Sequence, residues 1–177
     1  MKRSDLEHII RAAGTIADDE DIVVLGSQAV LGQFPDAPPE LLRSMEAGVF
    51  PRNHPERNDL IDGSIGEGSP FAAQFGYFAH GIDETTAVLP KDWRDRLVLV
   101  CNGNTRMIRG WCLEVHDLAI AKHAAGRDKD VEFTAALARH RLVRRNVLEE
   151  RLHVTDLDDE LRRRIRARIS RQFESQP

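Results

Sequence analysis

Cysteine and aromatic residues are scarce in this sequence. The only cysteines among its 177 residues are Cys101 and Cys112, and aromatic side chains make up 6% of the chain. The two cysteines form no Cys-x-x-Cys pair, and no His-x-x-x-His pair lies near them, so the spacing excludes the common zinc sites. We therefore expect two reduced, half-buried thiols.

Long apolar runs are also missing. No run approaches the roughly 18 residues that a membrane-spanning helix needs. The first residues include Lys2, Arg3, Asp5 and Glu7 and lack the apolar region of a secretory signal. These absences predict a protein of the reducing cytoplasm with no membrane partner.

The chain carries no excess of basic charge. Its 25 basic residues stand against 29 acidic ones, and the formal net charge of -4 gives no sign of nucleic-acid binding. The hydrophobic fraction of 41% and the charged fraction of 31% are typical of a soluble globular protein. At roughly 150 residues per domain, the length favours one main domain. We place it at residues 1–140, with a helical C-terminal segment, 141–177, packed on it.

Along the chain the spacing of apolar residues is typical in turn of short strands and of helices, which predicts a compact α/β protein. Ser4 and Glu7 have the form of a capping box for a first helix that ends near Gly14. The apolar run Ile22–Leu25 predicts a strand buried on both faces, preceded by a solvated acidic turn at residues 18–21. Asn102-Gly103-Asn104 predicts a hairpin turn. Further strands are expected at 44–50, 85–89, 96–101 and 107–115. Further helices are expected at 71–79 and 117–126, and from 128 to the end with breaks near 140–141 and 153–155.

The first strand ends in Gly26-Ser27 and turns directly into a predicted helix. This arrangement places backbone N–H groups and a hydroxyl at the positive end of the helix, where an anion such as a phosphate is stabilised. A tight turn with no ligand is the alternative. The strand at 44–50 carries Glu46 between apolar residues, and a carboxylate there is costly to desolvate unless a cation or a hydrogen-bond donor meets it.

These residues resemble the nucleotidyltransferase superfamily, whose hallmark is an apolar strand ending in Gly-Gly or Gly-Ser, a short helix, and a strand bearing Asp-x-Asp or Asp-x-Glu. The match is Val24-Leu25-Gly26-Ser27 followed by Glu46, and the similarity spans roughly residues 20 to 140. The chain is also similar to the AbiEii-type and related uncharacterised bacterial branches. The later residues that carry this second resemblance are Asp117-Leu118, Lys122, Ala125-Gly126-Arg127, Lys129 and Asp130.

The resemblance implies a nucleotidyltransferase-like mixed β-sheet flanked by helices, of the α/β (α+β) class. It also implies Mg²⁺-dependent transfer of a nucleotidyl group from a nucleoside triphosphate to an acceptor, which could be RNA, a protein hydroxyl or a small molecule. Gly26 and Ser27 would bind phosphates, and Glu46 would be a catalytic residue that helps to hold the metal. Transfer of this kind depends on neutralising charge and on in-line positioning, which carboxylate-bound divalent ions supply.

Two residues of the later motif are expected to contact phosphate. In the family a lysine at the position of Lys122 reaches the triphosphate, and Arg127 is a further candidate for nucleotide binding. A solvated helix lysine is the alternative for Lys122. For Arg127 the alternative is a structural ion pair with Asp130.

The strand at 44–50 departs from the family pattern at its second acidic position. Residues i and i+2 of a strand point to the same face, so an acid at position 48 would share a metal with Glu46, but the chain has Gly48 there. A further catalytic carboxylate would have to come from a neighbouring strand, and Glu114 is the candidate. Gly48 therefore keeps a second hypothesis open, that of a catalytically impaired member acting as a nucleotide-binding or protein-partner module of the toxin–antitoxin kind.

The C-terminal region combines an apolar stripe with many arginines. The stripe at 157, 161, 165, 169 and 173 predicts an amphipathic helix docked on the core with its arginines in solvent. RNA contact or a protein-partner surface is the alternative. The histidines form no recognisable metal-binding spacing and are expected at the surface or at helix ends; they include His54, His80, His116 and His123.

Overall fold

A computed structural model describes residues 1–174 and divides the chain into two compact units. Unit 1 comprises Met1–Thr86 and Leu97–Glu114. Unit 2 comprises Ala87–Arg96 and the described residues from Val115 onward. The helices predicted at 117–126 and from 128, which the sequence places in or next to the main domain, belong to unit 2.

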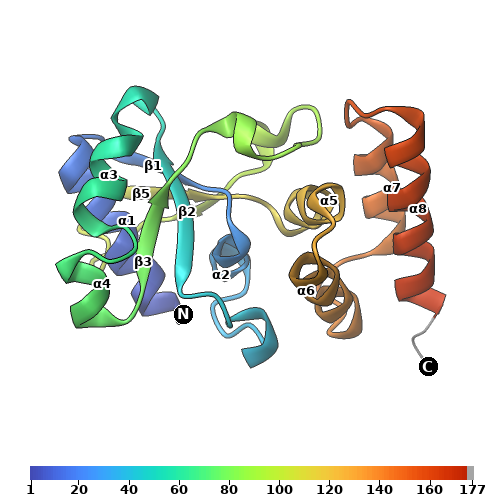
Figure 1. The fold of residues 1–177 in the computed structure, drawn as a ribbon, viewed down its shortest axis with the longest axis horizontal. Helices are drawn as coiled ribbons and strands as arrows, with labels where there is room; N and C mark the ends of the chain where they lie inside the picture. Colours follow the sequence, from blue (N-terminus) through green and yellow to red (C-terminus); the bar gives the residue numbers. More distant parts are fainter. Residues whose placement is uncertain (175–177) are drawn as a thin grey trace. The chain divides into compact units, whose positions relative to one another are not determined.

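Unit 1 is built on a five-stranded mixed sheet with strand order β3-β2-β1-β5-β4 (Figure 1). The central strand β1 pairs antiparallel with β2 and parallel with β5. β2 pairs parallel with β3, and β4 pairs antiparallel with β5. The strands are β1 (Asp21–Val24), β2 (Glu46–Pro51), β3 (Phe78–Gly81), β4 (Val98–Val100) and β5 (Arg109–Cys112). This mixed sheet with flanking helices confirms the predicted fold class.

Helices pack on the sheet where glycines allow close approach. A methyl group at Gly110 of β5 would lie 2.4 Å from the Ile10 Cδ1 atom of α1, and one at Gly81 of β3 would lie 2.3 Å from the Asn58 carbonyl oxygen of α3. The central strand β1 is buried on both faces, as predicted, because Ile22, Val23 and Val24 are at most 2% exposed. The helices of unit 1 are α1 (Arg3–Ala17), α2 (Val30–Gln33), α3 (Asn58–Ile65) and α4 (Pro70–Phe75).

The ends of α1 differ from the prediction. The helix begins at Arg3, and the Asp5 carboxylate accepts a hydrogen bond from the Lys2 backbone N–H at 2.7 Å. Glu7 is not a cap residue. Gly14 lies inside the helix, where Ile108 packs so closely that a methyl group would come within 2.7 Å of its side chain. The helix ends instead at Asp18, which adopts a left-handed conformation with φ of 49°.

Two predictions between residues 71 and 89 need correction. The helix expected at 71–79 ends at Phe75, because Gly76 adopts a left-handed conformation, and the following residues join the sheet as β3. The strand expected at 85–89 is absent from the described residues, where a 3-10 turn covers Glu84–Thr86. The hairpin predicted at residues 102–104 is confirmed, since β4 and β5 on either side of it pair antiparallel.

Unit 2 is helical. Gly126, with φ of 64°, separates its first two helices, as the Ala-Gly-Arg motif predicts. Ile165 and Ile169 are fully buried, which confirms that the last helix is amphipathic. None of the described helices is both long and apolar enough to cross a membrane. The helices are α5 (Val115–Ala125), α6 (Asp128–Arg139), α7 (Arg145–His153) and α8 (Asp159–Glu174).

Candidate functional site

The predicted site residues of unit 1 lie at one end of the sheet. β1 and β5 run parallel, so Gly26-Ser27 and Glu114, which follow these strands, lie at the same end. β2 runs antiparallel to β1, so its first residue, Glu46, lies at this end too. Topology therefore brings together residues that are up to 88 positions apart in the chain.

Gly26-Ser27 form the turn between β1 and a short helical segment, as predicted. Gly26 has an extended conformation and caps a 3-10 turn, Ser27–Ala29, which continues into α2. The Ala29 N–H donates to the Gly26 carbonyl oxygen at 2.9 Å. Because both helical segments are only one turn long, the local N–H groups and the Ser27 hydroxyl, rather than a long helix dipole, would act on an anion here.

A close backbone contact joins this turn to β2. The Leu25 N–H donates to the Gly48 carbonyl oxygen at 3.1 Å. A methyl group at Gly26 would lie 2.9 Å from the Gly48 nitrogen, and a methyl group at Gly48 would lie 3.0 Å from Ile82 Cδ1 and 3.5 Å from the Gly26 nitrogen. A side chain at position 48 would therefore have to displace the end of the Ile82 side chain by a few tenths of an ångström.

Glu46 is exposed at the start of β2, where it pairs with Phe78 of β3. Its backbone is fixed by Ser44, whose hydroxyl accepts from the Glu46 N–H at 3.1 Å and donates to the Glu46 carbonyl at 3.0 Å. The desolvation cost inferred from the apolar neighbours of Glu46 therefore does not arise. The carboxylate is held at the end of the sheet in contact with solvent, where it could bind a cation.

Glu114 is half-buried and follows β5, two strands away from β2. Neighbouring strands lie about 4.8 Å apart, so the backbones that carry Glu46 and Glu114 are separated by roughly 10 Å. Among the described residues, no group of three or more His, Cys, Asp or Glu side chains is arranged to hold a metal ion. The described residues therefore do not form a preformed two-ion centre.

Lys122 and Arg127, the predicted phosphate contacts, lie in unit 2 and share one partner. The Asp130 carboxylate is 3.2 Å from Lys122 Nζ and 2.6 Å from Arg127 Nε, and its side chain is 2% exposed. Burial lowers the pKa of Lys122, and Asp130 opposes that shift. Burial would raise the pKa of Asp130, but the two cations outweigh it and the pKa lies below its ordinary value. The ion pair expected for Arg127 is confirmed, and Lys122 is not a solvated helix lysine because its side chain is only 16% exposed.

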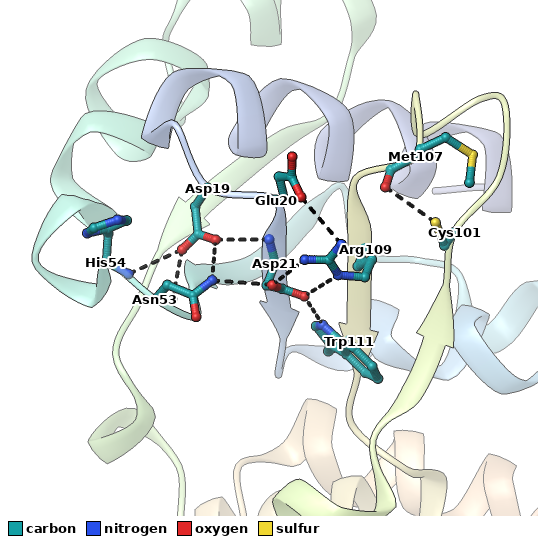
Figure 2. A network of polar contacts seen from close by, with 9 residues as sticks. All are labelled: Asp19, Glu20, Asp21, Asn53, His54, Cys101, Met107, Arg109 and Trp111. Carbon is teal, nitrogen blue, oxygen red and sulfur yellow. Dashed lines mark hydrogen bonds and ion pairs between the residues drawn. The ribbon is translucent and has the colours of Figure 1, made fainter.

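A dense polar network lies at the opposite end of β1 (Figure 2). The buried Asp19 carboxylate accepts hydrogen bonds from the backbone N–H groups of Asp21, Asn53 and His54 and from the Asn53 side chain, at distances of 2.7 to 3.2 Å. The expectation of a solvated turn at 18–21 is therefore wrong for Asp19. Its short side chain instead ties the start of β1 to the loop after β2.

Asp21 extends this network across the sheet to β5 (Figure 2). Its carboxylate accepts two hydrogen bonds from the Arg109 guanidinium, both at 2.7 Å, and one from the Trp111 indole N–H at 2.6 Å. The Arg109 hydrogen bonds hold the pKa of Asp21 well below its ordinary range, with Trp111 and Asn53 adding to the shift against the opposing effect of burial. All these carboxylate oxygens already have donors, so we assign the network a structural role.

Sequence reasoning missed this network because its members are spread over two strands, β1 and β5, and two loops. The one available signal was Asp21 itself, an acidic residue directly before the apolar run Ile22–Leu25. The partners Arg109 and Trp111 are two residues apart on β5 and share one face of the sheet. Their pairing with Asp21 depends on the parallel register of β1 and β5, which spacing along the chain does not specify.

A mixed sheet in which a Gly-Ser turn meets an acid-bearing neighbouring strand is the arrangement of a nucleotidyltransferase-like protein. Residues 4–174 match a family model described as a nucleotidyltransferase of unknown function (DUF6036), and the chain belongs to that family. No curated protein and no solved structure matches the chain at a significant level.

Proposed function

We propose that the protein transfers a nucleotidyl group from a nucleoside triphosphate to an acceptor, at the end of the sheet formed by Gly26-Ser27, Glu46 and Glu114. The observation that supports this most strongly is the convergence of β1, β2 and β5 at that end, because the Gly26-Ser27 turn, Glu46 and Glu114 then share one end of the sheet. Membership of the nucleotidyltransferase family is consistent with this reaction.

The chain's own residues have simple tasks in this proposal. The Ser27 hydroxyl and the N–H groups of the 3-10 turn bind phosphate oxygens, and Glu46 holds a Mg²⁺ ion against the triphosphate. When bound, Mg²⁺ neutralises charge that develops on the phosphates. Glu114 is half-buried, which suits a group that withdraws a proton from the acceptor hydroxyl.

Labelled-nucleotide transfer measured on purified protein tests the proposal. Glu46→Gln and Ser27→Ala should each lower the transfer rate about 100-fold or more, since each removes a group that stabilises charge in the transition state. Glu67→Gln is a matched control, because Glu67 is an exposed acid of unit 1 outside the site. Equal rates for wild type and Glu46→Gln would refute the enzymatic role of the site.

The packing at Gly48 favours a second candidate, a nucleotide-binding module that has lost transfer activity. A single carboxylate on β2 supports weak binding of Mg²⁺ together with a triphosphate but not a two-ion centre. Titration calorimetry with ATP, CTP and GTP in the presence of Mg²⁺ would then give a binding signal that Glu46→Gln weakens, while transfer is absent from both proteins. Absence of binding heat with every nucleotide would exclude this candidate as well.

The double variant Gly48→Asp with Ile82→Ala separates the two candidates further. Removing most of the Ile82 side chain clears the atom that a new Cβ at position 48 would meet first, at 3.0 Å. If the missing acid is what limits the reaction, this variant should transfer nucleotide faster than Ile82→Ala alone. Equal rates would show that the lost carboxylate does not limit activity.

A further inference from the structure

The two units carry charge of opposite sign. Unit 1 has 8 basic and 16 acidic residues, whereas unit 2 has 17 basic and 13 acidic residues. Their formal net charges are therefore -8 and +4, and the chain total of -4 conceals a basic unit. A basic unit attracts polyanions even when the whole chain is acidic, because charge acts over about 8–10 Å in physiological salt.

Five exposed arginines of unit 2 have no carboxylate partner among the described residues. Several half-buried cations of this unit are paired: Lys122 contacts Asp130, and Arg96 and Arg151 contact Asp117. Arg163, by contrast, donates only to a backbone carbonyl at 3.3 Å. The five arginines are Arg141, Arg144, Arg163, Arg164 and Arg166.

A hydrogen bond brings the two arginine-bearing segments together. Arg145, at the start of α7, donates from Nη2 to the Ser170 hydroxyl of α8 at 3.2 Å and pairs with Glu149 at 2.9 Å. Arg163 and Arg166 precede Ser170 by seven and four residues, so they lie on the same side of α8. Arg141 and Arg144 directly precede Arg145. We call Arg141, Arg144, Arg163 and Arg166 the basic surface of unit 2.

We propose that the basic surface of unit 2 binds the phosphodiester backbone of a nucleic acid. Guanidinium groups without carboxylate partners are suited to phosphate, because their planar N–H donors match phosphate oxygens in pairs. A membrane surface fits less well, since membrane-binding helices add large apolar side chains to their charges. The large apolar residues that are exposed in the described part of unit 2 are valines at 88, 131 and 154, outside the basic surface. This inference is independent of nucleotide transfer in unit 1.

Fluorescence anisotropy with a labelled oligouridine and the matching oligothymidine, each of about 20 nucleotides, tests the proposal on the full chain. Four phosphate contacts predict that log K falls with log salt with a slope of about -3, and Arg163→Gln with Arg166→Gln should reduce that slope by about 1.4. Arg163→Lys with Arg166→Lys keeps the charge and should keep most of the binding. Binding of both probes indicates backbone recognition, and binding of oligouridine alone indicates additional contacts to the 2′-hydroxyl.

Two arginines whose backbone has a left-handed conformation provide a control that separates binding from folding. Arg141 has φ of 56° in unit 2, and Arg106 has φ of 50° on an exposed turn of unit 1. Replacement by glycine relieves backbone strain at either position and removes one positive charge. Arg141→Gly should weaken nucleic-acid binding and lower the salt slope by about 0.7, whereas Arg106→Gly should leave both unchanged.

Several outcomes would overturn the proposal. Absence of binding at low salt would do so, as would equal losses in Arg141→Gly and Arg106→Gly. Retention on vesicles of phosphatidylcholine and phosphatidylserine without binding to either oligonucleotide would replace nucleic acid by a membrane. Glu46→Gln should bind the oligonucleotides as wild type does, so failure of nucleotide transfer and failure of nucleic-acid binding are observed separately.

Discussion

Asp21 joins β1 to β5 through its side chain as well as through the backbone. Its carboxylate is 14% exposed and receives hydrogen bonds from Arg109 and Trp111. Because these bonds favour the ionised form, the pKa of Asp21 is lower in the folded protein than in the unfolded chain. The stability that they contribute is present above the unfolded pKa of about 3.9 and is lost as the pH falls below it.

Asp21→Asn should lower the free energy of unfolding by about 1–2 kcal/mol at pH 7, because a charge-assisted network is replaced by weaker neutral contacts. Urea denaturation followed by fluorescence measures this value. The difference between wild type and variant should shrink as the pH falls below about 4. A difference that stays constant down to pH 2 would show that the Asp21 charge is not what stabilises the network.

His123 of α5 is buried, contrary to the expectation of a surface histidine. It is 2% exposed, and neither ring nitrogen has a hydrogen-bond partner among the described residues. Burial, assisted by nearby Arg168, lowers the pKa of His123 to about 4. The side chain is therefore neutral at pH 7, and protonation opposes folding.

His123→Leu should remove a pH dependence of stability. The pKa of His123 in the folded protein lies below the unfolded value of about 6.5, so the wild type is most stable above that pH. Its free energy of unfolding should fall by on the order of 3 kcal/mol as the pH falls toward 4. The leucine variant should lose much less over the same range in urea denaturation. His153→Gln, a change at an exposed histidine of α7, should leave the wild-type profile intact.

At the scale of elements, glycines decide how closely helices approach the sheet. Gly14 of α1 faces Ile108. A methyl group added at Gly14 would lie 2.7 Å from the Ile108 side chain and 2.8 Å from the Asp19 carbonyl oxygen. Gly63 of α3 has nothing within 4 Å of such a methyl group. Both glycines are helical, so intrinsic propensity favours alanine equally at the two positions.

Gly14→Ala and Gly63→Ala should therefore change stability in opposite directions. Alanine gains about 0.5–1 kcal/mol of helix propensity at either position, but at Gly14 overpacking costs about 1–3 kcal/mol and outweighs it. Thermal unfolding should show a lower midpoint for Gly14→Ala and a higher one for Gly63→Ala. Equal stabilisation by both substitutions would mean that α1 shifts away from Ile108 at little cost.

The elements also show where the sequence was sufficient for prediction. The β1 strand and the Gly26-Ser27 turn follow from local apolar pattern and turn chemistry, as does the hairpin at 102–104, and all are observed. The ends of α1 and the strand β3 were predicted wrongly, because they depend on non-local contacts. Gly14 lies within α1 and is packed closely against Ile108 of another segment. Phe78–Gly81 form a strand because β2 pairs with them.

The candidate site was predicted in part for the same reason. The positions of Gly26, Ser27, Glu46 and Glu114 at one end of the sheet follow from topology, which the family resemblance implied. The atom that a side chain at position 48 would meet first belongs to Ile82, 34 residues further along the chain, and no sequence pattern connects the two. Roles of these residues in nucleotide and metal binding stay predictions.

At the scale of the whole molecule, each unit has its own buried charge network. In unit 2 the fully buried Asp117 carboxylate is 2.8 Å from Arg96 Nε and 3.1 Å from Arg151 Nε. Asp117→Asn leaves both guanidinium groups without their counter-charge and should cost about 3 kcal/mol. This network shares no residue with that of Asp21 in unit 1.

The double variant Asp21→Asn with Asp117→Asn should therefore lose the sum of the two single losses, within about 0.5 kcal/mol. Chemical denaturation of the four proteins of the cycle measures the sum. A coupling energy well above 0.5 kcal/mol would contradict the independence of the two networks.

The contact between Gly32 of α2 and Cys112 of β5 makes the protein suitable for thiol labelling. A methyl group at Gly32 would lie 2.4 Å from Cys112 Cβ and 2.8 Å from its sulfur, so the helix backbone seals this thiol, whose pKa burial raises to about 12. Cys101 is partly accessible. An alkylating reagent should therefore modify Cys101 rapidly and Cys112 only when α2 moves away from the sheet. The rate of the slow phase then measures the rate at which unit 1 opens, and no probe has to be introduced.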